Sequence, residues 1–151
     1  MVNPGSGSAA VRWTGVCLDC ADAEALAAFY ARLLGWEVTA RDDATDRNGG
    51  AGWVALANPA GGVGLSFQAE DWYEPPVWPE QPDEQGKMLH LEVEVDDLAA
   101  AVALVLDAGG RVAPEQPSDR DPNELRVMLD PAGHPFCLFR GETPHTPGPA
   151  T

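Results

Sequence analysis

The chain has 151 residues, of which 44% are hydrophobic, and 9 basic against 24 acidic side chains give a formal net charge of −15. This length suffices for one domain with a core, or for two small modules that share one. The acidity excludes nucleic acid as a partner, because a phosphate backbone would be repelled. It indicates solubility first, with a preference for cationic ligands as the alternative. Without an apolar run near the roughly 20 residues of a membrane span or a signal peptide, the chain is predicted to be cytoplasmic, with no membrane partner.

Residues 1–10 are predicted to form a flexible tail, and a first module is predicted for 11–68. Its strand pattern GVCLDC is followed by Asp22, whose carboxylate suits a helix N-cap, and by apolar residues at helical spacing. Gly35 suits the end of that helix, because glycine enters the left-handed region without strain. A tight turn at NPAGG, from Asn58, then separates two further strand patterns.

Residues 69–87 form a linker that is rich in proline, tryptophan and carboxylates, and its prolines exclude a regular helix. A linker does not need aromatic rings, so Trp72, Tyr73 and Trp78 are expected to pack against something. They either cover a sheet edge or a dimer seam, or form a lid over a ligand cavity that Trp53 also lines. In the second case, flat rings beside carboxylates would suit a planar or cationic ligand.

The second module is predicted for 88–140, and a second flexible tail for 141–151. It repeats the order of the first: a strand pattern, an N-cap at Asp97, a helical run, a glycine at Gly110 and a turn, DPAGH, from Asp130. The spacing from Asp to Gly is the same in both modules. Neither module could bury its sheet alone, so the two are expected to share one core.

The stretch HLEVEVDD opens the second module. In a strand it places His90, Glu92 and Glu94 on one face and aliphatic side chains on the other. This trio could bind a metal, perform acid–base chemistry, or lie on a solvated sheet surface with an ion pair to Arg126. If the face is enclosed, the pKa values of unpaired carboxylates would be raised, and either could act as a general base.

Three segments, LDCADAEALAAFYARLLGWEV, HLEVEVDDLAAAVALVLDAGG and DPAGHPFCL, together resemble the vicinal oxygen chelate superfamily, the glyoxalase and bleomycin-resistance fold. The chain is most similar to a glyoxalase-like subgroup of actinobacterial proteins that have a W-P before the second module, here Trp78 and Pro79. The resemblance implies an α+β fold in which two βαβββ modules in one chain form a curved mixed sheet, a cup, with helices on its outer face. It also implies a ligand inside the cup and a homodimer.

Metal-binding members of that superfamily take ligands from the first and last strands of each module. Those positions fall on His90 and Cys137 in the second module. In the first they fall on Gly15 and on Leu65 or Ser66. One of the four therefore matches and a second offers a thiolate, whereas a catalytic metal site generally needs three protein ligands. No cofactor is predicted; if a metal binds, His90 and Cys137 would hold it.

The chain has further residues of the types that bind metals, and two of them could add a ligand to His90 and Cys137. Glu92 or Cys17 could supply a third ligand, since both should face the cup. Cys17 and Cys20 form a C-x-x-C inside a strand pattern without a second pair, so both are interpreted as buried thiols. His134 and His145 lie in a turn and in the tail and are rejected as ligands.

The function predicted is metal-independent binding of a small organic molecule, planar or cationic, in the manner of the bleomycin-resistance branch. It would sequester an antibiotic or natural product. The predicted ligand-binding residues are Trp53, Trp72, Trp78, His90, Glu92, Glu94, Arg126 and Cys137. The alternative is an enzyme of the same fold that uses His90 and Glu92, either a metal-free isomerase or cyclase or a metal-dependent lyase or dioxygenase. A third possibility is a stress or regulatory protein whose cup has lost its ligand.

Overall fold

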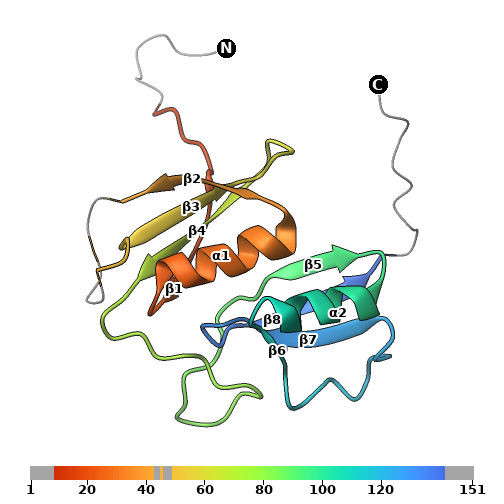
Figure 1. Ribbon diagram of the computed structural model, residues 1–151. Helices are drawn as coiled ribbons and strands as arrows, with labels where there is room; N and C mark the ends of the chain where they lie inside the picture. The colour runs from red at the N-terminus through yellow and green to blue at the C-terminus, as the bar shows by residue number, and fades with distance from the viewer. Residues whose placement is uncertain (1–8, 43–44, 46–48, 142–151) are drawn as a thin grey trace, which may run out of the picture.

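The computed structural model describes residues 9–42, 45 and 49–141, so most of both predicted tails lies outside the described residues. Each module contains a strand, a helix and three strands. The first consists of β1 (Gly15–Cys20), α1 (Ala23–Leu34), β2 (Glu37–Arg41), β3 (Trp53–Ala57) and β4 (Gly64–Ala69). The second consists of β5 (Glu92–Val95), α2 (Leu98–Asp107), β6 (Arg111–Val112), β7 (Leu125–Leu129) and β8 (Pro135–Arg140) (Figure 1).

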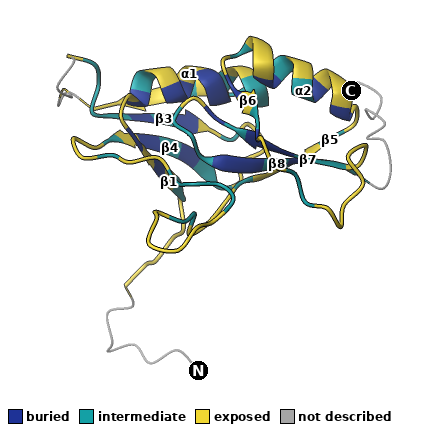
Figure 2. Ribbon diagram, turned by 90° about the horizontal axis from the view of Figure 1, so that it is seen from below, coloured by how far each residue is buried: buried dark blue, intermediate teal, exposed yellow. Residues whose placement is uncertain are grey.

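The two sheets have the same topology. Their strand orders are β1-β4-β3-β2 and β5-β8-β7-β6, and in each the first strand runs parallel to the last. Both helices lie on the same side of the strand layer (Figure 2). The α+β class and the duplicated βαβββ module are therefore confirmed.

The helices begin as the sequence predicts. Asp22 Oδ1 accepts a hydrogen bond from Ala25 N at 3.0 Å, and Asp97 Oδ1 accepts the equivalent bond from Ala100 N at 2.9 Å. Each carboxylate thus satisfies one of the unpaired N–H groups of a first turn. The end of α1 also agrees, since Gly35 takes a left-handed φ of 68°.

The end of α2 differs from the prediction. The helix stops at Asp107, and Gly109, with a φ of 102°, takes the left-handed conformation that was expected of Gly110. Gly110 serves a different purpose, because a Cβ there would lie 2.5 Å from Val105 Cγ1. The first of the two glycines therefore turns the chain, and the second allows it to pass close to the helix.

One hydrophobic core spans both modules, as predicted. The ring of Tyr30 in α1 stacks on Phe67 of β4, with centroids 5.5 Å apart, and meets Phe136 of β8 at 6.0 Å. All three side chains are buried. Because the aromatic contact between Tyr30 and Phe136 joins the modules, packing as well as the linker fixes their relation.

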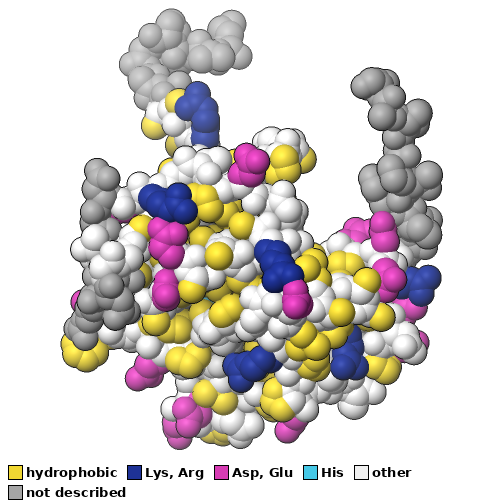
Figure 3. Space-filling view, in the orientation of Figure 1, with side chains coloured by type: hydrophobic (Ala, Val, Ile, Leu, Met, Phe, Trp, Pro, Cys, Tyr) yellow, Lys and Arg dark blue, Asp and Glu magenta, His cyan; other side chains and the backbone are white. Residues whose placement is uncertain are grey.

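Charged side chains are interspersed with hydrophobic ones on the helix-bearing face, and several basic groups lie beside acidic ones (Figure 3). Arg32 of α1 pairs with Asp107 of α2, and Arg41 Nε lies 2.7 Å from Glu24 Oε1. These side chains are substantially exposed, so each pair adds little to stability. The first pair joins the two helices, and the second joins β2 to α1.

The face of the strands that points away from the helices carries several exposed polar side chains. In β1, Leu18 and Cys20 are buried against the core, whereas Cys17 and Asp19 are exposed on the other face. The same alternation places Glu92 and Glu94 outward in β5. The strand predicted from His90 begins only at Glu92, and His90 lies in the segment that leads into it.

Candidate functional site

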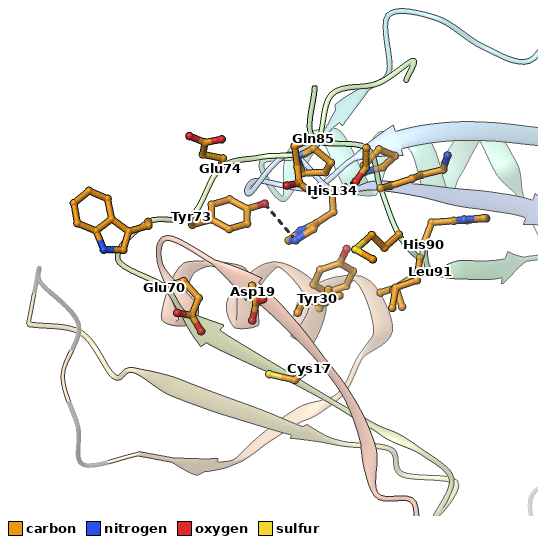
Figure 4. Close-up of a pocket in the computed structure, with 18 residues that line it drawn as sticks. Cys17, Asp19, Tyr30, Glu70, Tyr73, Glu74, Gln85, His90, Leu91 and His134 are labelled. Atoms are coloured by element: carbon orange, nitrogen blue, oxygen red, sulfur yellow. Dashed lines mark hydrogen bonds between the residues drawn. The ribbon is translucent and has the colours of Figure 1, made fainter. Parts of the chain in front are cut away.

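A cavity of about 490 Å³ lies between the modules. Its walls are β1, the Tyr30 ring of α1, two parts of the linker region (residues 70–76 and 85–91) and the turn before β8 (Figure 4). This volume falls within the range of small-molecule pockets in proteins. Two of the three linker rings, those of Trp72 and Tyr73, therefore border a cavity.

A buried carboxylate organises the turn at one wall. Asp130 is fully buried, and its Oδ1 accepts hydrogen bonds from Ala132 N at 2.9 Å and His134 N at 3.0 Å. Its Oδ2 lies 2.8 Å from both Tyr30 Oη and His134 Nδ1. Every partner can donate, so a carboxylate with a proton on His134 Nδ1 satisfies all four contacts. The imidazole is thereby held in one orientation.

The remaining nitrogen of His134 faces the linker. Its Nε2 lies 3.3 Å from Tyr73 Oη, and that hydroxyl donates to Ala132 O at 2.8 Å (Figure 4). Burial is the main cause that raises the pKa of Tyr73 well above its usual value, and the negative charge of Asp130 adds to it. The hydroxyl of Tyr73 therefore keeps its proton across the physiological range.

The cavity is negatively charged and partly aromatic. Asp19, Glu70 and Glu74 line it together with Trp72, which is 85% exposed and so stands at its rim. Lys87 also lines the cavity, but its Nζ bonds Glu80 Oε1 at 2.9 Å. Carboxylates beside exposed aromatic rings disfavour anionic ligands and favour neutral or cationic ones.

The predicted site residues on and beside β5 are only partly brought together. His90 lines the cavity, and its Nε2 lies 3.3 Å from Glu92 Oε1. Glu92 and Glu94 themselves do not line it; they are exposed on the open face, in register with Cys137 and Phe139. Burial, with a smaller effect of Glu92, raises the pKa of the half-buried Cys137 thiol.

Trp53 and Trp78 lie apart from the main cavity, unlike Trp72. Trp53 borders a neighbouring hollow of the first module, which Trp72 also borders. The indole N–H of Trp78 donates to Glu115 O at 3.1 Å, and Lys87 Nζ lies 4.3 Å from the centre of its ring. Trp78 therefore secures the linker to the loop before β7 and does not itself line the cavity.

Arg126 lies on the wrong side of the sheet for the role predicted. It pairs in register with Leu138, whose side chain is buried beneath the helix, and it lines a hollow beside the start of α2. The cup-facing partner of Cys137 is instead Val127, one residue along. A shift of one residue moves a side chain to the other face, so Arg126 is removed from the predicted ion pair with Glu92 and Glu94.

Cys17 is not the buried thiol that was predicted, because it is exposed. It does lie on the predicted face of β1, where it lines the cavity. Cys20 is buried as predicted, and its Sγ donates to Gln68 O at 3.4 Å. Burial raises the pKa of Cys20 to about 12, so its thiol stays protonated and unreactive.

The dyad of Asp130 and His134 is the part of the site that the sequence interpretation missed. The position of His134 in a turn argues against it as a metal ligand, and its hydrogen-bonded pair with Asp130 was not predicted. The available signal was the difference between the two repeated turns, since NPAGG in the first module becomes DPAGH in the second. An Asp and a His that appear together in only one of two equivalent turns indicate a role beyond turn formation.

The residues at the superfamily's metal positions do not fit a metal centre. Gly15 has no side chain, and a Cβ there would lie 2.8 Å from Gly64 O, so this strand register leaves no room for one. Ser66 pairs with Cys17 in the first module in the same way that Cys137 pairs with Glu92 in the second. Ser66 is therefore the last-strand position that corresponds to Cys137. Across residues 9–42, 45 and 49–141, no group of three or more His, Cys, Asp or Glu side chains is arranged to hold a metal ion.

The fold and the duplicated module together define a member of a known family. The family model described as a glyoxalase-like domain matches residues 15–139, and the chain belongs to that family, within the vicinal oxygen chelate superfamily. The comparison with curated proteins found no match. Within the part of the chain that is described, no helix is long and apolar enough to cross a membrane.

Solved structures support the same fold. A glyoxalase/bleomycin resistance protein/dioxygenase family enzyme from Burkholderia phytofirmans PsJN is 20% identical with a TM-score of 0.61, covering 86% of this chain and 98% of that one. A glyoxalase family protein from Enterococcus faecalis is 20% identical with a TM-score of 0.57, covering 83% and 94%. TnmS3, an antibiotic binding protein from Streptomyces sp. CB03234, is 20% identical with a TM-score of 0.51, covering 89% and 98%.

Proposed function

We propose that this protein binds a small planar organic molecule, neutral or cationic, in the cavity between its modules, and does so without a metal ion. The observation that carries the proposal is the combination of about 490 Å³ of space with carboxylates and aromatic rings in one wall. Sequestration of an antibiotic or other natural product is the physiological role that this proposal favours. The antibiotic binding protein among the similar folds supports that role by analogy of fold.

The chemistry of the walls limits the ligand. Trp72 and Tyr73 offer ring faces, and Glu70 and Glu74 lie in the same part of the linker. A flat ligand can stack on such rings, and a positive charge gains from both the rings and the carboxylates. An anionic compound of the same shape would meet repulsion from a chain of net charge −15.

The test is a binding screen on protein that has been stripped of metal with a chelator. Planar aromatic compounds with a quaternary ammonium group are compared with carboxylate analogues of the same rings by tryptophan fluorescence and calorimetry. We expect saturable binding of the cationic members in the presence of chelator. Binding that requires an added divalent metal, or that prefers the anionic members, would overturn the proposal.

Two exposed tryptophans provide a matched pair for this screen. Trp72 is 85% exposed and lines the cavity, whereas Trp13 is 75% exposed and does not line it. Trp72→Ala should weaken binding by about 1–3 kcal/mol, the size expected for loss of a stacking ring in a binding site, and Trp13→Ala should leave it unchanged. Equal effects of the two variants would place the ligand elsewhere.

The homodimer implied by the superfamily stays a prediction. Sedimentation equilibrium of the full chain tests it directly, since a dimer doubles the mass of 16.0 kDa. A concentration-independent monomer would contradict it.

A further inference from the structure

We propose that Asp130 and His134 form a metal-free acid–base site in the wall of this cavity, beside the ring of Tyr73. In it, Nε2 of His134 acts as a general base toward an O–H group of a neutral or cationic substrate, or of a water molecule beside that substrate. This activity goes beyond binding, and it rests on the proposed function only in requiring that the cavity admit small molecules. It also moves the catalytic role from His90 and Glu92 to a different histidine.

The positions of the protons carry the argument. His134 Nδ1 donates to a carboxylate oxygen of Asp130 at 2.8 Å, which leaves Nε2 of the neutral ring with a lone pair. A hydroxyl lies beside it, that of Tyr73 at 3.3 Å, and this hydroxyl gives its single proton to Ala132 O at 2.8 Å. No donor to Nε2 is therefore supplied by these contacts, and a bound molecule can supply one.

The ring of His134 is also held in one orientation. The Asp130 carboxylate is fixed by Tyr30 Oη at 2.8 Å and by two backbone N–H groups, so the ring that it holds has little freedom. His134 keeps 20% of its side-chain surface exposed, while Asp130 is fully buried. A buried carboxylate that positions a partly exposed imidazole is the arrangement in which histidine accepts protons efficiently, because the carboxylate stabilises the imidazolium that forms.

The surrounding charges favour the same direction of proton transfer. Tyr30 and Tyr73 meet the dyad from α1 and from the linker. The other titratable groups that line the cavity are Cys17, Asp19, Glu70, Glu74, Lys87 and His90. The carboxylates outnumber the lysine, so a positive charge on His134 is stabilised and an anionic substrate is disfavoured. The substrate class is therefore neutral or cationic.

The proposed step balances without any further reagent. The O–H proton moves to Nε2, and the electron pair of that bond stays on oxygen, which attacks a carbonyl carbon of the substrate. The bond from that carbon to the leaving group breaks with its electrons on the leaving group. The imidazolium then gives its proton to the leaving group or to solvent, so nothing is oxidised or reduced.

The first experiment uses 4-nitrophenyl acetate, a small neutral planar ester, and measures release of nitrophenolate by the metal-stripped protein. We expect His134→Gln to lose at least about tenfold of the protein-dependent rate, a conservative value for loss of a general base. The matched control is the same substitution at His145, a residue outside the described part of the chain. His145→Gln should keep the rate. An unchanged rate in His134→Gln would overturn the proposal.

The positioning role of Asp130 needs a readout that folding alone would not move. Tyr30→Phe removes one donor to Asp130 and leaves both residues of the dyad in place. A carboxylate that loses a donor attracts the imidazolium more strongly, so the pH at which the rate rises should move upward. An identical pH profile in Tyr30→Phe and wild type would remove Asp130 from the mechanism.

The second experiment needs no substrate binding. Diethyl pyrocarbonate transfers its ethoxycarbonyl group to a nucleophilic imidazole nitrogen, with ethyl carbonate as leaving group, and peptide mass mapping gives the rate at each histidine. His134 should react, and Tyr73→Phe, which removes the oxygen beside Nε2, should increase its rate. A His134 that stays unmodified in both proteins while His145 reacts fully would overturn the proposal.

The experiments distinguish a failure of the proposed ligand binding from a failure of the proposed acid–base site. If no planar compound binds but His134 reacts and hydrolyses the ester, the proposed ligand class is wrong and the acid–base site stands. If planar compounds bind at Trp72 but the His134 variant keeps the full rate, the protein is a binder and the acid–base site is wrong.

Discussion

The turns before β4 and β8 occupy equivalent places in the two modules and share two local contacts, one made by a side chain and one by the backbone. In the first module, Asn58 Oδ1 accepts a hydrogen bond from Ala60 N at 2.9 Å. In the second, Asp130 Oδ1 accepts the equivalent bond from Ala132 N, also at 2.9 Å. In both turns the backbone carbonyl of that first residue also accepts a hydrogen bond from the glycine three positions along, Gly61 or Gly133, at 2.9 Å. A side-chain acceptor at the first position and this backbone bond together form a turn of this kind.

The two turns differ in the contacts that reach beyond the turn itself. Asp130 also binds Tyr30 and the ring of His134, whereas the position equivalent to His134 is Gly62 in the first module, where a Cβ would lie 2.9 Å from the Asn58 amide nitrogen. Asp130 is fully buried and Asn58 only half-buried. The buried charge and the imidazole are thus additional to the needs of the turn, and they lie at the wall of the cavity.

The largest effect is expected from making the second turn resemble the first. Asp130→Asn keeps an oxygen for Ala132 N but places an amide donor beside the donors of Tyr30 and His134. Leaving buried donors unpaired should lower the free energy of unfolding by about 1–3 kcal/mol or more. Urea denaturation followed by circular dichroism measures this, and an unchanged midpoint would show that the network is not coupled to folding.

Alkaline pH should lower the stability of the protein through two buried groups of the first module, Cys20 and Tyr30. Burial raises the pKa of Cys20 to about 12 and holds that of Tyr30 well above its usual value. The unfolded chain then loses these protons at lower pH than the folded chain, so stability is full below about pH 9 and falls as pH rises, by at most about 1.4 kcal/mol per pH unit for each group. Cys20→Ala should flatten the fall measured by urea unfolding at several pH values; an equal slope would contradict this cause.

A smaller effect is expected at the linker. Tyr73→Phe removes the hydroxyl that bonds Ala132 O and leaves the ring in place. The loss should be about 0.5–1.5 kcal/mol, because one hydrogen bond of a half-buried group disappears. Thermal unfolding checks this value, and a loss as large as that of Asp130→Asn would mean that the linker, not the carboxylate, organises the turn.

The smallest effect is expected from the reverse change in the first module. Asn58→Asp keeps the oxygen that accepts from Ala60 N and loses only the 3.3 Å bond to Val63 O. Because this side chain is half-buried, stability should change by no more than about 0.5 kcal/mol. A loss comparable to that of Asp130→Asn, measured in the same urea experiment, would make the two turns energetically alike.

The fold was predictable because its signals are local. Asp22 and Asp97 cap their helices through bonds to residues three positions along, and such contacts are visible in the order of residues. The repeat of the whole pattern then favours a duplicated module that shares a core. The position of the left-handed glycine after α2 was harder, because Gly109 and Gly110 are adjacent and their neighbours in space decide between them.

The site was less predictable because its parts come from distant positions. Tyr30 and Asp130 are 100 residues apart, and no local pattern brings them together. The side of the sheet on which Arg126 lies was also hidden, because β7 alternates weakly: both Val127 and Met128 are buried. Where strand alternation was clear, as for Cys17 and Glu92, the predicted face agrees with the structure.

The most direct test of the cavity as the ligand site is to map amide and histidine side-chain NMR shifts while titrating a binding compound from the cationic panel. The predicted result is a set of saturable changes at Tyr73, His90 and His134, with little change at Trp53 or Glu94 on the open sheet face. Changes confined to Trp53 and Glu94, with none at His134, would contradict the account and return the ligand to the open cup.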